Sequence, residues 1–267
     1  MNPDHTPRIH TSTATGGRAA GQQTPQPQHV HTPRQQPGPF SPNPVVGQGD
    51  LVLYHAPNTR SAGARILLEE LGVPYRLHVL NMKANEQRSP PFLAVNPMGK
   101  VPALVHQGVL VTEQAAVYLY LADMFPEAGL APAVNDVMRG AYLRWMVFYG
   151  SCFEPALIDR AMNREPGPPS ATPYGDAETT IAAISNHLEK GPYILGDRMT
   201  AVDILWGTSL QWVTRFKLIT PTPAVQAYID RMTARPSFAK IREEDAALSA
   251  QHAAEADPQN GAAPASS

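Results

Sequence analysis

The chain has 267 residues, a formal net charge of −2 at pH 7 and a hydrophobic content of 43%. This length predicts two domains, and the charge gives no electrostatic basis for binding nucleic acid or an anionic membrane. No apolar run approaches the ~20 residues of a membrane-spanning helix. The N-terminus lacks the apolar core of a signal peptide, and a single cysteine excludes an internal disulfide. We therefore expect a cytoplasmic protein.

Both ends of the chain have the composition of disordered tails. Residues 1–49 are rich in Pro, Gln, Thr and His and contain too few large apolar residues to offset the entropy of ordering the chain. Their histidines have no spacing that would fix a ligand geometry, so we expect no metal site. Residues 246–267 are rich in alanine and form the second predicted tail.

Residues 50–125 show the pattern of an α/β domain, in the order βαβ and then ββα. The Gly72 that follows the first predicted helix is typical of a helix end, and Gln107-Gly108 suits a two-residue hairpin turn. Thr112 is placed as the N-cap of the last helix. The predicted elements are strands 51–54, 75–80, 102–106 and 109–111, helices 61–71 and 113–124, and a polar helix-and-loop region 81–94 broken by Pro90-Pro91.

After a predicted linker at 126–136, residues 137–245 show helical periodicity only, which predicts an all-helical second domain. Thr200 and Asp203 have the spacing of a capping box, in which the hydroxyl accepts one free amide and the carboxylate reaches back to another. The predicted helices are 137–162, 177–190, one that opens at Thr200, 224–234 and 238–245.

Four stretches resemble the cytosolic glutathione S-transferases, with the serine-using bacterial branch most similar. They are HAPNTRSAGAR at 55–65, NPMGKVPAL at 96–104, TEQAA at 112–116 and YILGDRMTAVDI at 193–204. The resemblance implies a thioredoxin-like N-terminal domain, an all-helical C-terminal domain and a homodimer. It also implies glutathione as co-substrate, no metal, and a cis peptide bond at Val101-Pro102.

The resemblance further implies where glutathione binds. Lys100, Val101 and Pro102 would contact its glycyl and cysteinyl parts, and Glu113 would bind the γ-glutamyl ammonium. Gln114 departs from the family pattern, in which a serine follows the acid, although an amide can still donate a hydrogen bond to a carboxylate.

Activation of the thiol requires one well-placed hydroxyl. Lowering a thiol pKa from about 8.5 to about 6.5 corresponds to ~2.7 kcal/mol, and a hydrogen bond to a charged group contributes ~1.5–3 kcal/mol. Ser61, at the predicted start of the first helix, is the first candidate. Tyr54 and Thr59 are the alternatives, whereas Arg60 stands where cysteine-using relatives carry their cysteine.

The resemblance also places an apolar second substrate against the long helix of the second domain. Trp145, Tyr149 and Phe153 form one stripe on that helix, and Tyr149 and Phe153 are the candidates that would line the pocket. His55 and His106 are predicted to be structural or exposed.

We therefore predict a glutathione S-transferase that directs the glutathione thiol at a small apolar electrophile. Two alternatives stay open: a non-enzymatic glutathione-binding or interaction protein on the same scaffold, and a glutathione-dependent isomerase or dehalogenase. The sequence does not identify the electrophile.

Overall fold

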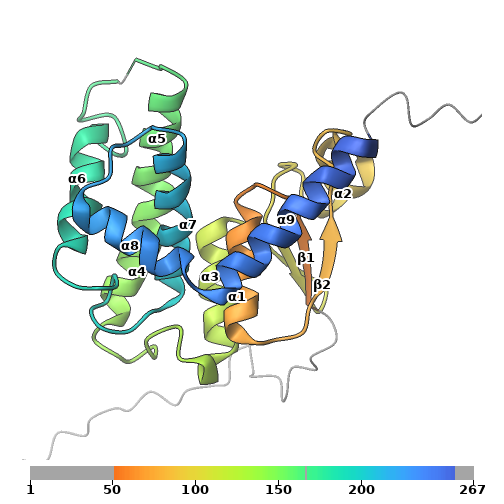
Figure 1. The fold of residues 1–267 in the computed structure, drawn as a ribbon, viewed down its shortest axis with the longest axis horizontal. Coiled ribbons are helices and arrows are strands. Elements are labelled where there is room, and N and C mark those ends of the chain that lie inside the picture. Colours follow the sequence, from red (N-terminus) through yellow and green to blue (C-terminus); the bar gives the residue numbers. More distant parts are fainter. Residues whose placement is uncertain (1–50, 166, 256–267) are drawn as a thin grey trace, which may run out of the picture. The chain divides into compact units, whose positions relative to one another are not determined.

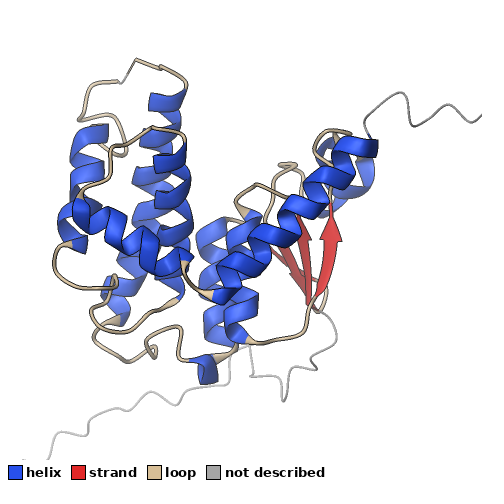
Figure 2. Cartoon of the chain, in the orientation of Figure 1, coloured by secondary structure: helices blue, strands red, loops and turns tan. Residues whose placement is uncertain are grey.

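The computed structural model describes residues 51–165 and 167–255. The predicted N-terminal tail lies outside the described residues. Within them, a four-stranded sheet with its helices is followed by a series of helices, as predicted (Figure 2). None of the described helices is long and apolar enough to cross a membrane.

The sheet has the strand order β2-β1-β3-β4. β1 pairs with β2 in parallel and with β3 antiparallel, and β4 pairs antiparallel with β3. Gln107 and Gly108 both have positive φ, as a two-residue hairpin between β3 and β4 requires. The strands are β1 Leu51–His55, β2 Arg76–Val79, β3 Ala103–His106 and β4 Val109–Val111.

Helices cover both faces of this sheet. α1 (Ser61–Leu71) and α3 (Gln114–Met124) pack on the face from which Leu51 and Leu53 project. α2 (Pro90–Val95) packs on the other face through Phe92. Successive residues of β1 therefore face opposite sides of the domain.

Two expectations for this domain are wrong. Pro90 and Pro91 do not break a helix, because they form the first turn of α2, where a proline loses no hydrogen bond. Thr112 is not the N-cap of α3, since that helix begins at Gln114 and Glu113 occupies the N-cap position. In contrast, α1 has the predicted bounds, and Gly72 ends it in the left-handed conformation.

The second domain is helical, as predicted. The expected single helix 137–162 is present as α4, a π-helical segment and α5 in succession. The core of this domain contains Trp145 and Trp206, and the Trp206 indole Nε1 donates to the Trp145 carbonyl at 3.2 Å. The elements are α4 Arg139–Phe148, the π segment Tyr149–Phe153, α5 Glu154–Ala161, α6 Ala177–Leu188, α7 Ala201–Arg215, α8 Pro223–Thr233 and α9 Pro236–Glu255.

The last helix, α9, departs from the prediction in both length and position. The expected tail from residue 246 is wrong for residues 246–255, which continue α9. α9 runs alongside α1 (Figure 1), and an ion pair between Lys240 and Glu69 joins the two helices. Although α9 comes last in the chain, it therefore packs on the first domain.

Candidate functional site

The strand register brings three of the predicted site segments to one end of the sheet. Tyr54 at the end of β1 pairs with Ala103 at the start of β3, so the β1–α1 loop and Val101-Pro102 share that end. Leu104 pairs with Val111, so β4 also finishes there, just before Glu113. This end is therefore the candidate site.

The loop before β3 is fixed by a buried asparagine. The Asn96 side chain donates from Nδ2 to the Lys100 carbonyl at 2.8 Å, and its Oδ1 accepts from the Met98 amide at 3.1 Å. Gly99 has φ +62°, which glycine adopts without steric cost. The Val101-Pro102 bond that follows is cis, which confirms the prediction. Lys100 is exposed at the outer edge of this loop.

The start of α3 carries a strained residue. Glu113 is exposed and has φ +65° and ψ +118°, a conformation that costs a non-glycine residue roughly 1–3 kcal/mol and is typical of ligand sites. Gln114, the next residue, donates from Nε2 to the Arg60 carbonyl at 3.3 Å. The amide that replaces the family serine therefore already has a partner within the protein.

In the β1–α1 loop, Ser61 is the first residue of α1 and is fully buried. Its Oγ lies 2.8 Å from His55 Nδ1, 2.7 Å from Thr59 Oγ1 and 3.2 Å from the Ala56 amide, which donates to it. Thr59 is half-buried. Of the two hydroxyls, that of Thr59 is therefore the outer one.

Behind Ser61 lie His55 and Asp245, two residues that were not predicted to belong to the site. His55 Nε2 is 3.0 Å from Asp245 Oδ1, and Arg65 Nη1 donates to the same oxygen at 2.8 Å. Burial lowers the pKa of His55 and outweighs the raising effect of Asp245, so the imidazole is neutral at pH 7. His55 follows Leu51 and Leu53 on the buried face of β1, which was the available sequence signal.

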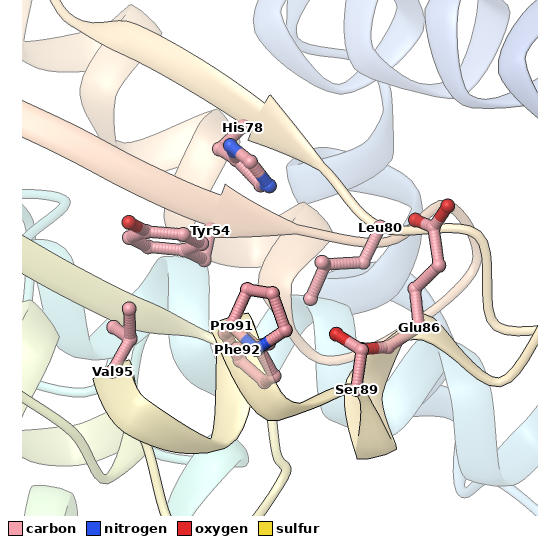
Figure 3. Close-up of a pocket in the computed structure, with 8 residues that line it drawn as sticks. All are labelled: Tyr54, His78, Leu80, Glu86, Ser89, Pro91, Phe92 and Val95. Carbon is pink, nitrogen blue, oxygen red and sulfur yellow. The ribbon is translucent and has the colours of Figure 1, made fainter.

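Tyr54 projects from the opposite face of β1, next to α2. Its ring centroid lies 4.8 Å from that of His78 and 5.5 Å from that of Phe92. Figure 3 shows these rings among the side chains that line a cavity. The cavity has a volume of about 370 Å³, and Thr59, Ser61 and His55 are not among its lining residues. The lining residues are Tyr54, His78, Leu80, Glu86, Ser89, Pro91, Phe92 and Val95.

The two candidates from the second domain lie in different surroundings. The Tyr149 hydroxyl is 3.2 Å from Gln114 Oε1 and 3.3 Å from Glu154 Oε1, and burial raises the pKa of Tyr149. Glu154 also forms an ion pair with Arg60. Phe153, with 1% of its surface exposed, packs on Trp206 in the core. Tyr149 therefore reaches the candidate site, whereas Phe153 does not.

The part of the chain that the structure describes contains no group of three or more His, Cys, Asp and Glu side chains that could hold a metal ion. The functional groups at the site are hydroxyls, the His55 imidazole, carboxylates and the Arg60 guanidinium.

Comparisons with known proteins give a consistent result. The family model for the glutathione S-transferase N-terminal domain matches residues 49–123, and the model for the C-terminal domain matches residues 176–236. Glutathione S-transferase GstA of Escherichia coli O157:H7 is 29% identical over 187 residues, which cover 69% of this chain and 93% of the relative.

Two solved structures extend the likeness to the fold. A glutathione transferase from Methylococcus capsulatus is 28% identical with a TM-score of 0.62, covering 74% of this chain and 99% of that one. A homologue from Sulfitobacter, solved with bound glutathione, is 26% identical with a TM-score of 0.59, covering 73% of this chain and 98% of that one.

Proposed function

The chain belongs to the glutathione S-transferase family, and we propose that it joins the thiol of glutathione to a small apolar electrophile. One observation carries this proposal: the sheet register places the cis Val101-Pro102 loop, the strained Glu113 and the β1–α1 loop at the same end of the sheet. These segments would supply the two anchoring points for the tripeptide and a hydroxyl for its sulfur.

Glutathione would bind along this end of the sheet. The main chain of Val101, turned outward before Pro102, would pair with the cysteinyl part, and Lys100 would attract the glycyl carboxylate. Glu113 would accept hydrogen bonds from the γ-glutamyl ammonium, and the amides at the start of α3 would bind the adjacent carboxylate. Gln114 would contribute through its side-chain amide, which also donates a hydrogen bond to the Arg60 carbonyl.

Thr59 would contact the sulfur. Ser61 was the first candidate from the sequence, but its hydroxyl is fully buried and surrounded by polar neighbours from the protein. The half-buried Thr59 hydroxyl, 2.7 Å from that of Ser61, is better placed to reach a ligand. Tyr54 would be the weaker alternative, because its ring lies at the other face of β1, against His78 and Phe92.

The electrophile would lie between the β1–α1 loop and the π-helical segment. Tyr149 would form one wall, beside the ion pair of Arg60 and Glu154. Phe153 is left out of the proposed pocket because it packs on Trp206 and has no polar group, whereas the Tyr149 hydroxyl contacts Gln114 at the candidate site. The homodimer and the cytoplasmic location stay predictions from the resemblance.

The test combines a turnover screen with one matched pair of variants. The full chain is assayed with glutathione and aryl halides, epoxides, peroxides and maleyl compounds. Glu113→Ala should weaken glutathione binding, measured by calorimetry, by ~1.5–3 kcal/mol, the contribution of a hydrogen bond to a charged group. Glu127→Ala removes another exposed glutamate near a helix start and should leave the affinity unchanged.

Two results would contradict the proposal. Equal affinity in wild type and a folded Glu113→Ala variant would mean that the carboxylate only occupies the N-cap position of α3. Tight glutathione binding without turnover of any electrophile class would instead favour a non-enzymatic binding protein on the same scaffold.

A further inference from the structure

Four side chains form a continuous hydrogen-bonded path from the candidate site to the last helix. Thr59 Oγ1 lies 2.7 Å from Ser61 Oγ, which lies 2.8 Å from His55 Nδ1, and His55 Nε2 lies 3.0 Å from Asp245 Oδ1. Ser61, His55 and Asp245 are at most 3% exposed, whereas Thr59 is half-buried. We call this path the Thr59–Asp245 relay.

The chemistry of the four groups sets the direction of these hydrogen bonds. A carboxylate only accepts, so the proton of the neutral imidazole is on Nε2, facing Asp245, and Nδ1 is an acceptor. The Ser61 hydroxyl therefore donates to Nδ1, and its oxygen can accept from Thr59. The Ala56 carbonyl is the other acceptor open to both hydroxyl protons, at 2.7 Å from Thr59 Oγ1 and 3.3 Å from Ser61 Oγ.

We propose that His55 is the base of the reaction and takes the glutathione proton through Thr59 and Ser61. The thiol gives its proton to Thr59 Oγ1, the Thr59 proton passes to Ser61 Oγ, and the Ser61 proton passes to His55 Nδ1. The sulfur keeps its electron pair, so the products are a bound thiolate and an imidazolium. This proposal rests on the proposed function, which places the sulfur beside Thr59.

The carboxylates around His55 favour its protonated form, whereas burial and Arg65 oppose it. Asp245 and Glu244 from α9 and Arg65 from α1 are the charged groups that face the imidazole, and two carboxylates against one guanidinium leave one net negative charge. A proton on His55 would neutralise that charge. In the resting protein burial keeps the imidazole neutral, which is the state that a base requires.

A purely structural role for the same path would be to fasten α9 to β1. The two roles differ in one measurable respect: a structural link changes stability, whereas a base changes the pKa of the bound thiol. His55 is in this sense a positioning residue, since it would act on the sulfur only through two hydroxyls.

The experiment follows the ultraviolet absorbance of the bound thiolate, and the conjugation rate, against pH in the full chain. In His55→Gln the thiol pKa should rise by at least about one unit towards the free value near 8.5, so the neutral-pH rate falls about threefold or more and recovers near pH 9. Affinity for S-methylglutathione, which has no thiol proton, should stay unchanged.

His106→Gln is the matched control. His106 is a buried histidine of the same sheet that bonds the Tyr120 hydroxyl at 2.6 Å, outside the relay. Its variant should keep the wild-type pH profile even if it loses stability.

A folded His55→Gln variant with the wild-type thiol pKa would overturn the proposal. If that variant does not fold, Ser61→Ala cuts the relay between Thr59 and His55 and should shift the profile in the same way; an unchanged profile there would equally overturn it. A wild-type chain that binds no glutathione would instead refute the proposed function, so the two failures are distinguishable.

Discussion

Asp203 and Asp245 are both almost completely buried carboxylates, yet their partners differ in charge. Among the residues that the structure describes, Asp203 accepts only from neutral groups: the Ile194 amide at 2.7 Å, the Thr200 amide at 2.8 Å, and the hydroxyls of Thr200 and Tyr228. With no cation in contact, burial raises the pKa of Asp203 to about 6.

Asp245 instead faces the Arg65 guanidinium and the His55 imidazole, and it also accepts from the Asn58 amide at 3.1 Å. The partners of Asp203 lie within 25 residues of it in the chain, whereas those of Asp245 lie 180 to 190 residues away. Asp203 therefore stabilises the start of α7, and Asp245 joins α9 to the candidate site. Burial alone does not distinguish these roles, but the charge of the partners and their separation along the chain do.

The largest effect is expected from Asp203→Ala. The change leaves the Ile194 and Thr200 amides without their acceptor in the core, whereas the Tyr228 hydroxyl keeps the Asp203 backbone carbonyl at 3.1 Å. Each lost buried hydrogen bond costs about 1–3 kcal/mol. Because such costs are not additive, we expect a total loss of about 3–5 kcal/mol in the free energy of unfolding, measured by urea denaturation. Asp230→Ala, at an exposed position of α8, should change it by less than about 0.5 kcal/mol. Similar losses in the two variants would contradict the structural role of Asp203.

A smaller effect is expected from Asp245→Asn. The amide removes the negative charge beside the buried Arg65, but Glu244 stays paired with that guanidinium. Breaking a buried ion pair costs about 3–5 kcal/mol, so with this remaining partner we expect a loss of roughly 2–3 kcal/mol in urea denaturation. Glu244→Gln, at a more exposed site, should cost at most about 1 kcal/mol. A larger loss for Glu244→Gln would show that Asp245 is not the principal anchor of α9.

The same contrast explains what could be predicted from the sequence. The capping box of Thr200 and Asp203 was predictable, and the structure confirms it, because both residues lie within one helical turn. The bounds of α1 follow from its apolar spacing and from Gly72. The cis Val101-Pro102 bond was predictable only through the family resemblance, since few X-Pro bonds are cis.

The contacts that the sequence did not reveal depend on distant partners. No local pattern relates His55 to an aspartate 190 residues later. The alanines of residues 246–255 favour a helix, but its place beside the first domain depends on contacts such as Asn58 Nδ2 to Ser249 Oγ at 2.6 Å. The positive φ of Glu113 likewise has no sequence signal, because only tertiary contacts sustain that strain.

The smallest effect on stability is expected from Glu70. Its contribution to stability changes with pH in the opposite direction to that of Asp203. Burial raises the pKa of the Glu70 carboxyl, but hydrogen bonds from Arg235 and Ser237 lower it by more, so the net shift is downward. Its contribution to stability is therefore fully present above the ordinary pKa near 4.5 and is lost as pH falls through the lowered value. The raised pKa of Asp203 gives a contribution that is lost as pH rises towards about 6.

Glu70→Gln should accordingly lower the free energy of unfolding by about 1 kcal/mol at pH 7 and by progressively less below pH 4.5. Urea denaturation of wild type and variant at pH 7, 5, 4 and 3 measures this convergence. Glu69→Gln is the control, because Glu69 pairs with the half-exposed Lys240 and that pair should contribute little at any pH. A Glu70→Gln difference that stays constant or grows with acidity would mean that the Arg235 hydrogen bonds do not depend on the carboxylate charge. The cation beside the carboxyl would then not determine the sign of its pKa shift.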